Sequence, residues 1–180
     1  MTLSVTIREA APPDAAGIAR VHVESWRTTY PGIMPQEHLD ALSVAEYEQT
    51  WQSRLREDSS GNTRSFVAVD DGKIIGFVRG GPIHLDDPDY TAEIYTLYLL
   101  KSQQGRGLGR RILAAIAKRL REDGHASLFL WTHVRNPARS FYEKLGGVAV
   151  RTTQRTIKGI VYDDVGYGWG AAALDILAGL

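Results

Sequence analysis

The glycine-rich stretch Gln104-Gly105-Arg106-Gly107-Leu108-Gly109-Arg110 is the most informative part of this sequence, because it lies between a predicted strand and a predicted helix. Glycine lacks a Cβ atom, so the backbone can turn sharply here and bring its N–H groups close to a ligand. The first turn of the following helix adds unpaired N–H donors and a partial positive charge. The stretch therefore predicts an anion-binding site, with Arg106, Arg110 and Arg111 as nearby cations.

Two other phosphate-binding patterns do not fit this stretch. A Walker-type loop ends in Gly-Lys-Ser/Thr, but Gly72-Lys73 is followed by Ile74 and has Val67 at the position of the first glycine. A dinucleotide-binding turn counted from Gly105 requires a glycine at the position that Arg110 occupies. The alternative hypothesis, a nucleotide-binding regulatory module, is therefore supported only by the glycines and arginines of this stretch.

The segments on either side of the stretch predict a strand and an amphipathic helix. Residues 91–100 form an apolar run, and residues 108–122 carry an apolar stripe at helical spacing. Downstream, a strand is predicted over 127–132, a short helix from Asn136-Pro137 through Tyr142, and a closing hairpin over 148–155 and 161–169.

The first half of the chain predicts a strand over 3–8, a helix over 12–30, and a second helix over 43–56 that begins at the capping box of Ser43 and Glu46. Two strands over 65–69 and 73–79 flank Asp70-Asp71-Gly72, which suits a tight hairpin. The order β, α, α, β, β, β, α, β, α, β, β predicts an α/β protein with a mixed sheet. We expect one domain over residues 1–180, with a C-terminal tail over 170–180.

Composition excludes several classes of protein. The 180 residues contain 21 basic and 21 acidic side chains, so no overall field attracts nucleic acid. No cysteine is present, which excludes a disulfide framework and a thiolate zinc site, and the five histidines lack ligand spacing, so no metal is expected. No segment has the roughly 18 apolar residues of a membrane span. We expect a cytoplasmic protein with no membrane partner.

Gln104, Gly107 and Gly109, read as Gln-x-x-Gly-x-Gly, resemble the pyrophosphate-binding signature of the GNAT superfamily of acyl-CoA-dependent N-acyltransferases. A second stretch, from Asn136 through Phe141-Tyr142 to Gly146, resembles the second motif of that family. The resemblance covers roughly residues 3 to 169, although Lys101-Ser102 stands where many members have proline. It implies a mostly antiparallel central sheet with helices on both faces.

The resemblance also implies acetyl-CoA as co-substrate. Its pantetheine arm would lie along the backbone of Leu97 and Leu99, and its diphosphate on the glycine-rich turn. The turn residues assigned to the cofactor are Gln104, Gly105, Arg106, Gly107, Leu108, Gly109 and Arg110. Asn136 either contacts the ligand or only caps its own helix.

The reaction would be direct attack of an amine on the thioester. An alkylamine with a pKa near 10.4 needs help to lose its proton at pH 7, and Glu93 is the candidate base, aided by a raised pKa or a water relay. Tyr142 is the candidate acid for the leaving thiolate. Phe129, Trp131 and Trp51 are expected in the core.

The acceptor would lie beside Trp26 and Tyr30, near the loops over 30–35 and 156–161. A primary amine of a small molecule is expected. A protein amine, a non-catalytic acyl-CoA sensor and a homodimer remain open.

Overall fold

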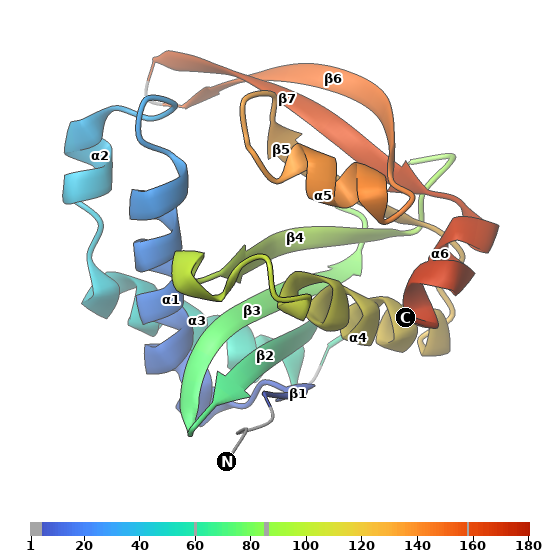
Figure 1. Ribbon diagram of the computed structural model, residues 1–180, viewed down its shortest axis with the longest axis horizontal. Coiled ribbons are helices and arrows are strands. Elements are labelled where there is room, and N and C mark those ends of the chain that lie inside the picture. Colours follow the sequence, from blue (N-terminus) through green and yellow to red (C-terminus); the bar gives the residue numbers. More distant parts are fainter. Residues whose placement is uncertain (1–4, 60, 85–86, 158) are drawn as a thin grey trace.

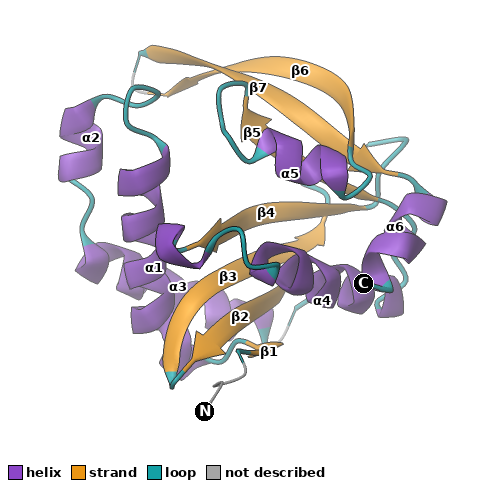
Figure 2. Ribbon diagram, in the orientation of Figure 1, coloured by secondary structure: helices purple, strands orange, loops and turns teal. Residues whose placement is uncertain are grey.

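A computed structural model describes residues 5–59, 61–84, 87–157 and 159–180. It contains one seven-stranded sheet in the order β1-β2-β3-β4-β5-β7-β6, with helices on both faces (Figures 1 and 2). The strands are β1 (Thr6–Glu9), β2 (Arg64–Asp70), β3 (Lys73–Pro82), β4 (Ala92–Leu99), β5 (Leu128–His133), β6 (Val148–Ile157) and β7 (Ile160–Trp169). The helices are α1 (Ala15–Thr29), α2 (Gln36–Asp40), α3 (Val44–Asp58), α4 (Leu108–Glu122), α5 (Arg139–Lys144) and α6 (Ala171–Ala178). The predicted α/β class and mixed sheet are confirmed.

The sheet is antiparallel except at one place. Strands β1 to β4 pair antiparallel with their neighbours, and so do β5, β7 and β6. Strands β4 and β5 are parallel and pair only over Ala92–Ile94 and Leu128–Leu130. Beyond this point β5 diverges from β4, as Figure 1 shows. The sheet is therefore joined at one end of the β4–β5 pair and open at the other.

A β-bulge lies where the two strands begin to separate. Arg79 of β3 pairs with Thr96 and Gly80 pairs with Ile94, so Tyr95 is an extra residue in β4. The Tyr95 hydroxyl donates a hydrogen bond to the carbonyl oxygen of Pro82 at 2.5 Å. Because a bulge bends the strand that carries it, Tyr95 helps to turn the second half of β4 away from β5.

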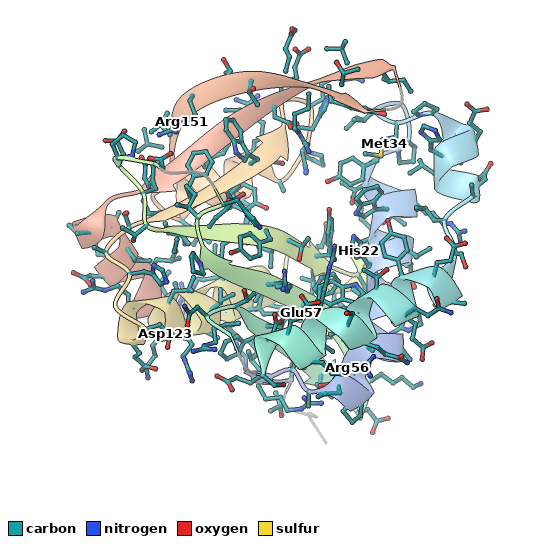
Figure 3. All side chains as sticks on the ribbon, turned by 180° about the vertical axis from the view of Figure 1, so that it is seen from behind. His22, Met34, Arg56, Glu57, Asp123 and Arg151 are labelled. Atoms are coloured by element: carbon teal, nitrogen blue, oxygen red, sulfur yellow. The ribbon has the colours of Figure 1, made fainter. Side chains whose placement is uncertain are left out.

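Helices α1 and α3 cover one face of the sheet, and α4 covers the other (Figure 1). On the first face, His22 of α1 lies among the side chains between the helices and the sheet (Figure 3), with Trp51 of α3 and Phe77 of β3. On the second face, the predicted stripe of α4 is buried. Its members are Leu108, Ile112, Leu113, Ile116 and Leu120.

The hairpin between β2 and β3 confirms the turn prediction, since Asp71 and Gly72 adopt φ angles of +46° and +71°. The start of the first predicted strand, Leu3 and Ser4, lies outside the described residues. Ser43 begins α3, and its Oγ accepts a hydrogen bond from the Glu46 amide at 3.4 Å. Helix α2 is not predicted from the sequence.

The expected C-terminal tail is largely a helix, α6. It packs on α4 and buries Leu174 and Leu177 completely, while Asp175 forms an ion pair with Arg121 of α4. Among the described helices, none is long and apolar enough to cross a membrane.

Candidate active site

A cavity of about 570 Å³ occupies the space where β4 and β5 diverge. Its walls come from the C-terminal end of α1, the second half of β4, the glycine-rich turn, β5 and α5. The main lining residues are Ser25, Tyr30, Ile94, Tyr95, Thr96, Leu97, Tyr98, Leu99, Gln104, Gly105, Gly107, Gly109, Arg110, Leu130, Trp131, Thr132, Asn136, Phe141 and Tyr142. The cavity thus joins both predicted motifs to the end of α1.

The glycine-rich turn requires glycine at two positions. Gly105 has a φ angle of +74°, and Gly107, the N-cap of α4, has a φ angle of +78°. Other residues adopt this left-handed conformation at a cost. Gln104 ties the turn to β4, because its Nε2 donates to the carbonyl oxygen of Leu99 at 3.1 Å. The turn therefore holds the amino end of α4 at the cavity.

Three of the residues assigned to anion binding lie elsewhere. The exposed Arg106 donates to Oε1 of Gln103 at 2.7 Å, and Arg111 donates to the carbonyl oxygen of Val5 at 2.8 Å. Leu108 is buried in the core, so only its peptide group could face a ligand. Of the three predicted cations, Arg110 alone is among the residues lining the cavity in the part of the chain that the structure describes.

The backbone of β4 presents to the cavity peptide groups that are not paired with β3, although the carbonyl oxygen of Leu99 already accepts from Gln104. The amide of Leu100 donates to the carbonyl oxygen of Ile75 on β3, at 3.0 Å. Peptide groups alternate in direction along a strand, so those of Leu97 and Leu99 point away from β3 and toward the diverging β5. An extended ligand with amide groups could pair with them as a strand does.

Tyr142 lies in α5 with its ring buried against other aromatic rings. The ring centroids of Phe141, Tyr167 and Trp169 are 5.3, 5.8 and 6.4 Å away. Its hydroxyl has no hydrogen-bond partner among the described residues, and burial raises the pKa of the phenol well above its ordinary value. Tyr142 therefore remains protonated and free to donate across the neutral pH range.

Asn136 is buried and lines the same cavity. Its Oδ1 accepts from the Ala138 amide at 2.9 Å in the turn before α5. The N-cap of α5 is Ala138, so the predicted cap at Asn136 lies two residues too early. Its side-chain amide group still lies at the cavity wall.

The two aromatic residues assigned to the acceptor share a face of α1, as predicted. The ring centroids of Trp26 and Tyr30 are 5.4 Å apart. Tyr30 lines the cavity and its hydroxyl oxygen is 3.5 Å from that of Tyr98, whereas Trp26 packs behind it, outside the lining. Burial raises the pKa values of both Tyr30 and Tyr98, so both phenols are neutral.

Glu93 lies outside the cavity lining. Its Oε2 is 3.2 Å from Nδ1 of His84, near the start of β4 and before the bulge at Tyr95. The structure therefore brings Tyr142, the glycine turn and Tyr30 together, but not Glu93.

Trp131 is not a core residue, although the sequence predicts it in the core. It is half-buried and lines the cavity, while Trp51 and Phe129 are core residues as expected. Trp131 follows the end of the β4–β5 pairing, so its exposure depends on where the two strands separate. No group of three or more metal-ligating side chains lies within the described ranges.

Comparisons with known proteins identify the family. Residues 21–147 match the family model described as the acetyltransferase (GNAT) family. The chain is 39% identical over 166 residues to the uncharacterized N-acetyltransferase YuaI of Bacillus subtilis (strain 168), covering 92% of each chain. The chain belongs to the GNAT family and is an acetyl-CoA-dependent N-acetyltransferase.

Two further matches come from Thermoplasma acidophilum. One is a spermidine N(1)-acetyltransferase, 28% identical over 147 residues, which cover 80% of this chain and 88% of that protein. The other is the crystal structure of the PaiA N-acetyltransferase in complex with coenzyme A, with a TM-score of 0.72 and 23% identity, covering 93% of this chain and 99% of that one. The second match shows that the two chains share the fold.

Proposed function

We propose that this enzyme transfers the acetyl group of acetyl-CoA to a primary amine of a small molecule, within the cavity between β4 and β5. The observation that carries the proposal is the meeting of three features in that cavity: the left-handed glycine turn, the peptide groups of β4 that face away from β3, and the protonated hydroxyl of Tyr142. The match to a coenzyme A complex of the same fold supports it.

The glycine turn and the first turn of α4 would hold the diphosphate through backbone N–H groups, with Arg110 as the nearby cation. Leu97 and Leu99 would hold the pantetheine arm through their peptide groups. Asn136 would add a side-chain contact from the opposite wall. Arg106 and Leu108 would act only through the backbone of the turn.

In the chemical step, the amine nitrogen forms a bond to the thioester carbonyl carbon, the carbon–sulfur bond breaks, and the nitrogen releases a proton to solvent to give the neutral amide. The departing thiolate, with an ordinary pKa near 8.5, takes a proton from Tyr142, which then regains one from solvent. The attacking amine must first lose a proton, at a cost of roughly 4.6 kcal/mol at pH 7. Because Glu93 lies outside the cavity lining, we assign that proton to a water relay leading toward Glu93.

The test is a steady-state assay of CoA release from acetyl-CoA with a panel of acceptors, with the acetylated product identified by mass. The panel includes alkyl monoamines, diamines, amino acids, an aminoglycoside and a peptide with a free amino terminus. Sustained turnover with a small amine supports the proposal. Turnover with the peptide alone contradicts the acceptor class, and tight acetyl-CoA binding without any turnover would indicate a sensor.

A further inference from the structure

Asp164 of β7 is a buried carboxylate with one oxygen that lacks a partner. Its side chain is completely buried, and its Oδ2 accepts from Nε of Arg155 on β6. Its Oδ1 is buried and has no hydrogen-bond partner in the described part of the chain. A buried carboxylate oxygen without a donor is unfavourable, so this atom is suited to receive a donor from a ligand.

The strand register puts Asp164 on the acceptor side of the sheet. Asp164 pairs with His133 of β5, and Gly166 pairs with Trp131. Side chains two residues apart share a face of a strand, so Asp164 lies on the same face as Trp131, which lines the cavity. In Figure 1 the C-terminal end of β6 and the start of β7 are on the same side of the molecule as α2 and the C-terminal end of α1.

Tyr30, which lines the cavity, interacts electrostatically with both Asp164 and Tyr142. Burial raises the pKa of Tyr30, and the nearby negative charge of Asp164 raises it further. The same tyrosine is close enough to Tyr142 to raise the pKa of that phenol, after the larger effect of burial. Asp164 also borders a second hollow, of about 650 Å³, with Val134 and Gln154. It is therefore placed beyond the cavity wall, near Tyr30.

This position suits a cationic group that does not react. A carboxylate beside the attacking nitrogen would hold it as an ammonium and oppose the reaction, whereas a carboxylate further away can bind a second ammonium without that effect. The positively charged groups that face Asp164 leave room for this second ammonium. The Arg155 side chain is 56% exposed and can move into solvent, and burial lowers the pKa of His133, which keeps that ring neutral at pH 7.

We propose that Asp164 selects acceptors with a second cationic amine, a diamine or polyamine whose distal ammonium donates to Oδ1. This inference rests on the proposed function. A substrate that carries a carboxylate, bound by Arg155 instead, fits less well. The unpartnered buried atom, Oδ1 of Asp164, accepts hydrogen bonds and so calls for a donor from the substrate.

The test compares 1,4-diaminobutane with 1-aminobutane as acceptors for the wild type, Asp164→Asn and Asp163→Asn. Asp163 is a matched control, because it is the adjacent residue and its exposed side chain accepts a hydrogen bond from Gln154 at 2.8 Å. We expect the wild type to prefer the diamine at least tenfold in kcat/KM. Asp164→Asn should remove most of this preference through a higher diamine KM, leave the monoamine within twofold, and leave acetyl-CoA affinity unchanged. Asp163→Asn should change neither acceptor.

A wild type without diamine preference would overturn the inference whatever the variants do. So would an equal loss on both acceptors in Asp164→Asn, or a preference for an amino acid that Arg155→Gln abolishes. If the monoamine is acetylated in any of these cases, the proposed function stands and only the role of Asp164 fails. If no amine of either kind is acetylated, the proposed function fails as well.

Discussion

Gly109 lies directly against the ring of Phe141, because a Cβ atom at Gly109 would come within 3.2 Å of both Cε2 and Cζ of that ring. Gly107 has open space around the same position but a left-handed backbone. The two glycines of the motif therefore serve different needs. Gly107 shapes the turn at the start of α4, and Gly109 lets α4 approach α5, next to Tyr142.

Gly107→Val should weaken acetyl-CoA binding by more than tenfold, or about 1.4 kcal/mol, because a side chain strains the turn that holds the diphosphate. Gly124→Val is the control, since Gly124 has a φ angle of +95°, has open space, and ends the same helix far from the cavity. Both variants should lose comparable stability. Isothermal titration calorimetry on the folded variants measures the affinity, and equal affinities would show that the turn makes no contact with the ligand.

Tyr142→Phe should lower kcat by about 10² to 10⁴ with little change in acetyl-CoA affinity, because it removes the proton donor and keeps the ring packing. Tyr162→Phe is a suitable control, since Tyr162 is also a buried tyrosine but lies outside the cavity lining. The measurement is steady-state kinetics with single-turnover confirmation that chemistry limits the rate. A wild-type kcat under those conditions would remove Tyr142 from the mechanism.

Tyr30→Ala should raise the acceptor KM several-fold and leave the acetyl-CoA KM within a factor of two. Tyr30 follows the last residue of α1 and lines the cavity there. Tyr30→Phe keeps the ring and removes the hydroxyl, whose oxygen is 3.5 Å from that of Tyr98, so it distinguishes the contribution of the ring from that of the hydroxyl. Equal losses on both substrates would indicate a packing role.

His22 should make the protein less stable in acid. Burial, followed by the positive charge of Arg54, lowers the pKa of His22 to about 3, from an ordinary value near 6.5. The folded state thus binds fewer protons than the unfolded state between these values, so this stability is complete above pH 6.5 and is lost as the pH falls toward 3. At pH 5 the loss is roughly 2 kcal/mol.

Urea unfolding at pH 7.5 and pH 5.0 measures this loss. His22→Gln keeps an acceptor for Nε1 of Trp51, which donates to His22 at 3.2 Å, and removes the titrating ring. The variant should lose less stability between the two pH values than the wild type and than His38→Gln, whose ring lies on α2 outside this aromatic cluster. Identical pH dependence in all three proteins would contradict the assignment.

Local patterns predicted the parts of this fold that local forces determine. The stripe on α4 follows from helical periodicity, and the turn at Asp71-Gly72 follows from residues that tolerate positive φ. Helix α6 was missed because it depends on burying Leu174 and Leu177 against α4, which is a tertiary contact.

The candidate site was predicted where the motifs are local, at the glycine turn and at Tyr142. The rest depends on geometry that the sequence does not display. The extra residue at Tyr95 changes which side chains of β4 face the cavity, and it separates Glu93 from the lining. Arg111 is drawn away by the carbonyl oxygen of Val5, a partner 106 residues distant in the chain.

The separation of β4 from β5 gives the sheet an interior edge in addition to its two outer ones. Unpaired peptide groups at an outer edge can recruit a strand from another chain. Here α1, α5 and the glycine turn border the gap, and a slender ligand with its own amide groups could pair with the peptide groups that face it. A ligand that pairs with both strands would link β1–β4 to β5–β7 across this gap. We therefore expect the two parts of the sheet to separate less easily when the ligand is bound.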